Sequence, residues 1–406
     1  MQIAARGIWN GSGEPRPGRV TITGGRIDQI LPPGPAQIDL GDCLLCAGFV
    51  NAHVHLDLSL PRTTDRLEGS FDEWLKSVVE TRRALGDDGI TMAATLGAEE
   101  ALASGTTALF DIDPAGHSIL ALIHSPLRRL ILREVIALQS QPGPDLETLT
   151  TFLQGSPDTS HELRGISPHS SYTVHPQVLA QLLPFCRQHG APWTMHVAEP
   201  EWERELLVEG SGEGAKFLEG FGADPTEFQR GETMIDSLSH SQDLTSNGLI
   251  IHGNQCRDDE LATMAKSGSA LVWCPRSHQF FGRAPHPAPR AVEAGVPVLL
   301  GTDAKVSAGN LSMLEELRCA AATAPELQAE VIWQMATVNP RQWLAAAGYP
   351  ELLGSGTLKV GDPADLVAVS IPDHDGPLLQ RALEGQVIAS WIGGRALQPE
   401  PIQEGQ

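Results

Sequence analysis

The stretch Phe49-Val50-Asn51-Ala52-His53-Val54-His55 joins a short apolar run to two histidines that are two residues apart. Successive side chains of a strand point to opposite faces, so His53 and His55 share one face of a strand that ends here. Two imidazoles on one face can bind the same divalent ion, and Zn²⁺ suits such ligands. The stretch therefore predicts a buried strand with a metal-binding end.

Eight apolar runs, of which 44–50 is the first, alternate with helix-like segments through the middle of the chain. Helices are expected at 71–84, 91–102 and 258–266. Strands that alternate with helices are typical of a parallel barrel or a doubly wound sheet. A dinucleotide-binding sheet is disfavoured because no early Gly-x-Gly-x-x-Gly motif is present. The other seven runs are 106–111, 130–137, 165–168, 192–195, 249–251, 270–273 and 296–300.

The two ends of the chain consist of short β-rich runs that are broken by turns. Gly24-Gly25 separates two such runs and signals a hairpin, and similar runs follow Gly356. We therefore expect an α/β fold, a (β/α)8 TIM barrel with a small β-sandwich domain built from both chain ends. The barrel is expected over 48–354 and the composite β domain over 1–47 and 355–400.

Composition limits the class of partner. The chain has a formal net charge of -22, a pI near 5.0 and no cluster of Lys and Arg, so nucleic acid is not an expected partner. A membrane is also not expected, because no apolar run approaches the ~18 to 20 residues of a span. We expect a cytoplasmic protein without a signal peptide. Cys43 and Cys46 have the spacing of a metal pair, but they lie in an apolar run and are expected to be buried thiols.

Polar residues follow directly after three later apolar runs. His196 and Glu199 follow the fifth run, His252 the sixth and Asp303 the eighth. In a barrel the carboxyl ends of all strands meet on one face, where the active site lies. A lone histidine is most often a structural residue, but this repeated placement predicts one site that contains all of these side chains.

The residue types at these strand ends fit hydrolysis. Three neutral imidazoles and one carboxylate can hold a divalent ion and leave a position for water, whose pKa then falls towards ~7. Asp303 is expected to bind the ion and to accept a proton from the water, and His252 to orient the water. Glu199 is expected to protonate a ring nitrogen and later the leaving group. One divalent ion is expected, Zn²⁺ first, with Fe²⁺ or Mn²⁺ as alternatives.

Residues 48–56, His196-Val197-Ala198-Glu199, Ile251-His252-Gly253 and Gly301-Thr302-Asp303 together resemble the amidohydrolase superfamily. The likeness is strongest to the mononuclear branch of adenosylhomocysteine deaminase, guanine deaminase and the triazine hydrolases. It implies that Glu199 is the proton shuttle and that His252 orients the water. Residues 164–173 contain no lysine of the kind that bridges two ions in binuclear relatives, which favours one metal. A homodimer is also implied as possible. The metal ligands implied are His53, His55, His196 and Asp303.

The substrate class is suggested by the loop at 273–287, which is similar to that of aminodeoxyfutalosine deaminases. Those enzymes remove the 6-amino group of an adenine-containing intermediate of menaquinone biosynthesis. His169 matches a histidine that contacts substrate in related deaminases. Trp74 is expected to stack on a purine and Arg276 to bind a substrate carboxylate. The sequence departs from many of these deaminases after Asp303, where it has Ala304 in place of serine.

Three functions stay open at this point. The first is metal-dependent deamination of an aminopurine nucleoside derivative, a small heterocyclic substrate. The second is hydrolysis of another heterocycle, by dechlorination or amine removal from an s-triazine-like ring or by opening of a cyclic amide. The third is a barrel without catalysis that serves as an interaction scaffold, which the intact ligand set disfavours. The remaining histidines, such as His278 and His286, match no ligand position, and most are expected on the surface.

Overall fold

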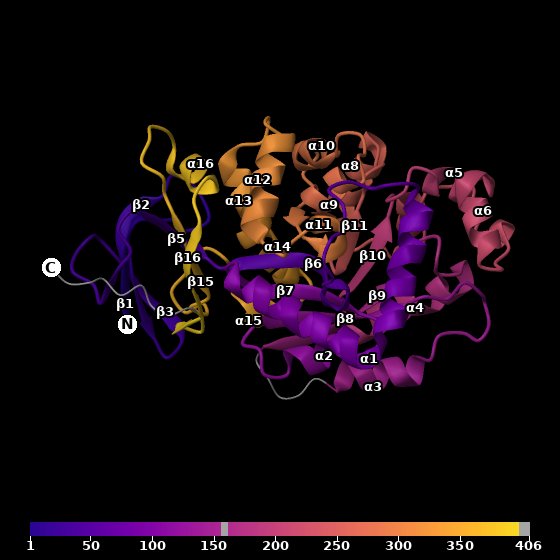
Figure 1. The fold of residues 1–406 in the computed structure, drawn as a ribbon, viewed down its shortest axis with the longest axis horizontal. Coiled ribbons are helices and arrows are strands. Elements are labelled where there is room, and N and C mark those ends of the chain that lie inside the picture. Colours follow the sequence, from indigo (N-terminus) through magenta and orange to yellow (C-terminus); the bar gives the residue numbers. More distant parts are fainter. Residues whose placement is uncertain (156–160, 398–406) are drawn as a thin grey trace.

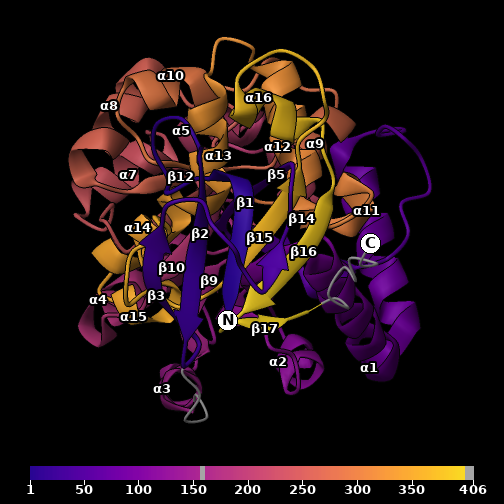
Figure 2. The ribbon, with the colours of Figure 1, turned by 90° about the vertical axis from the view of Figure 1, so that its left-hand side faces the viewer.

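The computed structural model describes residues 1–155 and 161–397, and its strands form two sheets of different kinds. One sheet is parallel and lies among the helices, and the other lies beside it and combines strands from the N-terminal and C-terminal parts of the chain (Figures 1 and 2). The chain is thus an α/β protein with a TIM-barrel-like part.

The parallel sheet curls until its last strand reaches its first. At one end of the sheet, β13 (Val298–Leu300) pairs with β12. After two intervening residues the chain forms β14 (Asp303–Ala304), which pairs with the first strand, β6 (Phe49–His55). Since β13 and β14 belong to one continuous segment, the sheet has the curvature of a barrel. The strands between them are β7 (Thr106–Asp113), β8 (Arg128–Val135), β9 (Glu162–Pro168), β10 (Trp193–Val197), β11 (Gly248–His252) and β12 (Ala270–Trp273).

Helices fill the connections between these strands (Figure 1). The helices expected at 71–84 and 91–102 are the two parts of α1 (Phe71–Ala103), which is interrupted at Gly86, where φ is 63°. Later helices are α2 (His117–Leu122), α3 (Leu146–Gln154), α4 (Pro176–His189), α5 (Glu203–Glu209), α6 (Gly212–Gly220), α7 (Met234–His240), α8 (Asp258–Ser267), α9 (Pro275–Phe280), α10 (Ala288–Glu293), α11 (Lys305–Ala308), α12 (Met313–Thr323), α13 (Ala329–Thr337), α14 (Asn339–Ala346) and α15 (Pro350–Leu353).

Side chains from widely separated strands meet in a single core cluster. Val50, Phe110, Leu132 and Ile251 belong to it, and all are fully buried. Strands on opposite sides of a curled sheet can share contacts only inside the curl, so this cluster fills the interior. Trp343 of α14 packs against Phe110 with ring centroids 5.5 Å apart, and this contact places α14 against the interior cluster.

The second sheet combines segments from both ends of the chain, as expected. It is an eight-stranded mixed sheet, and the sandwich form that we predicted for it is not confirmed. The predicted domain boundaries stay a prediction, and residues 398–400 of that range lie outside the described residues. The strands are β1 (Gln2–Ile8), β2 (Arg16–Thr23), β3 (Arg26–Leu31), β4 (Ile38–Asp39), β5 (Cys43–Ala47), β15 (Leu366–Ser370), β16 (Val387–Ile392) and β17 (Arg395–Ala396); α16 (Leu378–Leu383) joins β15 to β16.

The run predicted as one strand at 44–50 is divided between the two sheets. Its first part is β5 and its last residues begin β6, with Gly48 between them. A Cβ at Gly48 would meet the Thr107 side chain at 2.2 Å, so only glycine fits at this crossing. The predicted hairpin at Gly24-Gly25 is confirmed, because Thr23 pairs with Arg26.

Two expectations from composition can be compared with the structure. Cys43 and Cys46 are buried free thiols in β5, and burial raises the pKa of Cys43 to about 11 and that of Cys46 to about 12. Among the residues that the structure describes, none of the helices combines the length and apolar character needed to cross a bilayer.

Candidate active site

The predicted site residues lie at the carboxyl ends of the parallel strands. His53 and His55 end β6, His196 lies in β10, His252 ends β11 and Asp303 begins β14. His252 and Asp303 have φ angles of 68° and 60°, which are uncommon for residues with a Cβ. Such strained backbone is concentrated at functional sites because surrounding contacts hold it in place.

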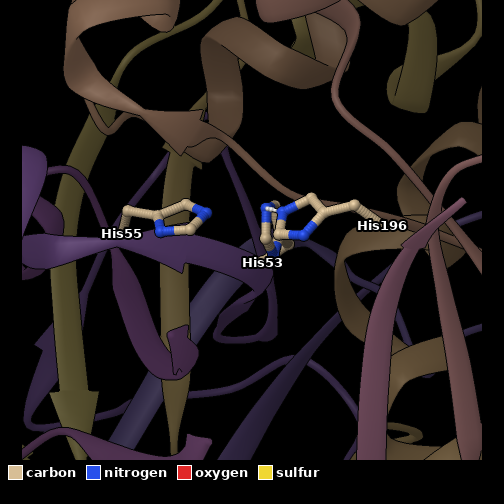
Figure 3. A group of neighbouring side chains, drawn as sticks. All are labelled: His53, His55 and His196. Carbon is tan, nitrogen blue, oxygen red and sulfur yellow. Dashed lines mark hydrogen bonds between the residues drawn. The ribbon is translucent and has the colours of Figure 1, made fainter. Parts of the chain in front are cut away.

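These five side chains form one buried cluster. His53 Nε2 lies 3.3 Å from His196 Nε2 and 3.6 Å from Asp303 Oδ1, and His55 Nε2 lies 3.8 Å from the same carboxylate oxygen. Figure 3 shows His55 and His196 reaching towards His53 from opposite sides. His252 also belongs, since one of its ring nitrogens lies within 4.8 Å of ligand atoms of His53 and Asp303.

The chemistry of these donors fits a cation. His196 Nδ1 is 2.6 Å from the His169 carbonyl oxygen, which only accepts, so Nδ1 carries the ring proton and Nε2 presents a lone pair to the cluster. Burial lowers the pKa of His53, His55 and His196, which keeps the imidazoles neutral. Converging lone pairs and a carboxylate need a positive ion between them, so these residues fit a divalent metal.

Two serines hold the carboxylate of Asp303. Ser277 Oγ donates to Asp303 Oδ2 at 2.7 Å and Ser307 Oγ donates to the same oxygen at 3.1 Å, which leaves Oδ1 facing the histidines. Burial acts to raise the pKa of Asp303, but the adjacent histidines, His53 first, lower it well below its usual range. The serine that many related deaminases have directly after this aspartate is Ala304 here, and hydroxyls from elsewhere bind the carboxylate.

Glu199 lies beside this cluster with its carboxylate held from two sides. Tyr172 donates its hydroxyl to Oε2 at 3.1 Å, and Arg283 Nη2 lies 3.4 Å from Oε1. His252 Nε2 lies 3.7 Å from Oε1, so Glu199 and His252 face each other. Burial raises the pKa of Glu199, and the Arg283 charge and the Tyr172 hydrogen bond oppose that rise. A carboxyl group with a raised pKa can carry a proton near neutral pH.

The three predicted substrate contacts lie in different surroundings. His169 is inside the site, because its ring centroid is 4.9 Å from that of His196. Trp74 belongs to an aromatic group at the start of α1, with its ring 4.9 Å from Phe281. The guanidinium of Arg276 is engaged elsewhere: it pairs with buried Glu316 at 2.9 Å and donates to Asn310 and Ala308. Substrate contact stays a prediction for His169 and Trp74, and Arg276 is bound within the protein.

Arg283, Tyr172 and Ser277 were not predicted from the sequence to belong to the site, and His286 was not predicted to be buried. Arg283 lies over the rings of Phe281 and Phe71, at 4.6 and 5.4 Å, and these contacts bring it to Glu199. His286 was expected on the surface, but it is 9% exposed and its Nε2 donates to the His252 carbonyl oxygen at 2.8 Å. No local motif marks these residues, since each is defined by contacts distant in sequence.

Comparison with protein families gives a match over most of the chain. The amidohydrolase family matches residues 44–397. The chain is 27% identical to an aminodeoxyfutalosine deaminase from Nitratiruptor sp. over 81% of its length and 80% of the relative. It is 29% identical to a 5-methylthioadenosine/S-adenosylhomocysteine deaminase from Desulfovibrio desulfuricans, over 87% of this chain and 78% of the relative.

Solved structures share the fold. An aminofutalosine deaminase from Helicobacter pylori superposes with a TM-score of 0.83 at 20% identity, over 98% of this chain and all of that chain. An atrazine chlorohydrolase from Arthrobacter aurescens, complexed with zinc, superposes with a TM-score of 0.79 at 18% identity, over 98% of this chain and 95% of that chain. Zinc therefore occurs in a protein of this fold.

Proposed function

This chain belongs to the amidohydrolase family, and we propose that it is a metal-dependent hydrolytic deaminase of an aminopurine nucleoside derivative, with aminodeoxyfutalosine as the first candidate substrate. The observation that carries the proposal is the position of Glu199, a buried carboxyl group beside the histidine cluster and opposite His252. The names of the curated relatives support deamination of an adenine ring.

We assign the metal to His53, His55, His196 and Asp303, with Zn²⁺ as the first candidate. A divalent ion held there would lower the pKa of a water molecule and so supply the attacking hydroxide. His252 has a pKa well below its ordinary value because of burial, so its neutral ring can accept a hydrogen bond and orient that water. Asp303, held ionised by its neighbours, accepts a proton as the attack begins.

Glu199 moves the protons of the reaction. The water oxygen bonds to the carbon that carries the amino group, while Glu199 protonates the adjacent ring nitrogen. Glu199 then takes the remaining hydrogen of the attacking water and passes it to the amino group. The carbon–nitrogen bond breaks, a carbonyl forms on the ring, and ammonia leaves with its two original hydrogens and that one. The ring nitrogen keeps the proton from Glu199, and the water proton that Asp303 accepted returns to Glu199, so both carboxyl groups regain their starting states.

The test is ammonia release from zinc-loaded protein. The panel contains aminodeoxyfutalosine, adenosylhomocysteine, methylthioadenosine, adenosine and an s-triazine. We expect Glu199→Gln to reduce kcat by roughly 10² to 10⁴ and to leave the metal content unchanged, since Glu199 is outside the ligand set. Glu209→Gln, an exposed residue at the end of α5, is the matched control. Release of amine or halide from the triazine alone would replace deamination by the second hydrolysis, and silence across the panel would refute the proposal.

A further inference from the structure

The short sequence Gly-Gly-Arg occurs at two hairpins of the second sheet, and the proposed function uses neither of them. Gly24-Gly25 joins β2 to β3 and precedes Arg26, and Gly393-Gly394 joins β16 to β17 and precedes Arg395. All four glycines have positive φ angles, between 54° and 77°, as a two-residue type I′ turn requires. The turns therefore explain the glycines, but not the arginine that follows each of them.

The two turns lie against each other at one end of the sheet. A Cβ on Gly25 would be 3.0 Å from the Gly393 carbonyl oxygen. Arg26 and Arg395 both line a cavity of about 560 Å³ beside these turns, and both side chains are exposed, so they lie at its opening. Arg26 donates to the Gly361 carbonyl oxygen at 2.7 Å, and neither arginine forms an ion pair among the described residues. The fold thus brings two cations to one opening.

Two more arginines form the inner wall of this cavity. Arg128 and Arg129 are the first residues of β8, and both are buried. Arg128 pairs with Asp365. Arg129 pairs with Glu162 at 2.9 Å, and Arg164 contacts the same carboxylate at 2.9 Å. Three arginines at this wall therefore share two carboxylates, so the wall keeps an excess of positive charge.

The charge of the cavity is opposite to that of the chain. Its described lining contains four arginines and one acidic residue, Glu351, whereas the chain has 28 Lys and Arg against 50 Asp and Glu. Like charges gathered at one place repel one another, and an anion between them removes that repulsion. A guanidinium presents paired N–H donors that match two oxygens of a phosphate group. The arginines therefore favour a phosphate group as the ligand.

Another part of the lining is apolar. Ile123, directly after α2, is 64% exposed although it is a large hydrophobic side chain, and Pro126 lies nearby in the same lining. A volume of about 560 Å³ is within the range of sites for small organic molecules and is larger than a single phosphate needs. The cavity therefore has room for an organic group beside the phosphate.

This cavity is far from the histidine cluster. Arg128 begins β8, whereas the cluster lies at the carboxyl ends of the parallel strands. A strand of eight residues such as β8 is roughly 25 Å long, and that length separates the two ends of the barrel-like part. A ligand in this cavity is therefore not the molecule that reacts at the metal site.

We propose that this cavity is a second binding site, separate from the active site, and that it binds an organic phosphate. Arg26 and Arg395 contact the phosphate from the second sheet, and Arg128 and Arg129 supply positive charge from the parallel sheet. Ile123 and Pro126 contact the organic group. Because the arginines come from both sheets, the bound ligand joins the sheets and stabilises the folded state.

The test is calorimetric titration of the zinc-loaded protein with inorganic phosphate, uridine 5′-diphosphate and citrate. The uracil ring has no amino group, so deamination does not interfere. The variant Arg26→Glu/Arg395→Glu changes two exposed side chains of the cavity, and Arg16→Glu/Lys266→Glu makes the same change of charge at exposed residues elsewhere.

We expect uridine diphosphate to bind more tightly than phosphate or citrate and to raise Tm. Its Kd is expected to rise by about tenfold or more in Arg26→Glu/Arg395→Glu, with the rise in Tm lost, and to stay within twofold in the control. Ile123→Ala is expected to weaken the binding of uridine diphosphate and to leave that of inorganic phosphate unchanged.

Several results would overturn the proposal. One is no binding of either phosphate compound at millimolar concentration, and another is a Kd for uridine diphosphate that Arg26→Glu/Arg395→Glu leaves within twofold. Equal loss of affinity in both double variants would also overturn it, because the effect would then be one of net charge. Citrate binding as tight as that of uridine diphosphate would overturn the phosphate class, and inorganic phosphate binding as tight would overturn the contact with an organic group.

Discussion

Replacing Ser277 with alanine removes the shorter of the two hydrogen bonds that hold the Asp303 carboxylate. The bond is 2.7 Å long, its donor is 1% exposed, and its acceptor is a charged oxygen. Hydrogen bonds to charged groups contribute about 1.5 to 3 kcal/mol. Because Ser307 shares its single hydroxyl hydrogen with the Ala304 carbonyl oxygen, which lies 3.0 Å away, it cannot fully replace Ser277. The freed carboxylate can rotate away from the histidines.

If that energy serves to orient a metal ligand, metal affinity falls by roughly 10- to 100-fold, as is common when the partner of a ligand is removed. The Kd for Zn²⁺ can be measured by competition with a chromophoric chelator for Ser277→Ala, Ser307→Ala and the double variant. We expect the double variant to bind least tightly. Ser241→Ala, an exposed serine after α7, is the control. A Kd unchanged within twofold in the double variant, or a tighter one, would refute the reasoning.

Two further predictions concern stability. Burial raises the pKa of Glu134 to about 8 from an ordinary 4.5, so the folded state holds this proton more tightly than the unfolded state, and stability falls as pH rises from 4.5 to 8. At roughly 1.4 kcal/mol per pH unit, we expect the free energy of unfolding to fall by a few kcal/mol between pH 6 and pH 9, and we expect no such fall in Glu134→Gln. Urea unfolding at the two pH values measures both proteins. Equal pH dependence of the two would contradict this prediction. Asp365, in the loop before β15, pairs with Arg128 of β8, and both side chains are buried. Asp365→Asn is therefore expected to lower the free energy of unfolding by about 3 to 5 kcal/mol, whereas the exposed control Asp375→Asn is expected to leave it unchanged. A loss below 1 kcal/mol for Asp365→Asn would show that this pair does not join the two sheets.

The sequence alone was sufficient for the parallel strands of the TIM-barrel-like part, because the pattern and length of an apolar run are local properties. Its eight runs correspond to the parallel strands, apart from 44–50, which divides at Gly48. That division depends on Thr107, a contact between distant segments, so no local pattern contained it. The sandwich predicted from the β-rich ends is not confirmed. The number of strands is a local property, whereas their arrangement in layers depends on pairing between distant segments.

The clustering of His53, His55, His196 and Asp303 was also predictable, since each follows an apolar strand and parallel strand ends meet on one face. What only the tertiary structure decided is how those residues are held. The Nε2 lone pair of His196 faces the cluster because Nδ1 donates to the His169 carbonyl oxygen. The carboxylate of Asp303 is oriented by Ser277, 26 residues before it, and by Ser307, 4 residues after it. Arg283 lies just after α9 and Arg276 lies within that helix, and the two side chains are of the same type. One faces Glu199 and the other pairs with Glu316, because the side chains around each guanidinium come from segments that only folding brings together.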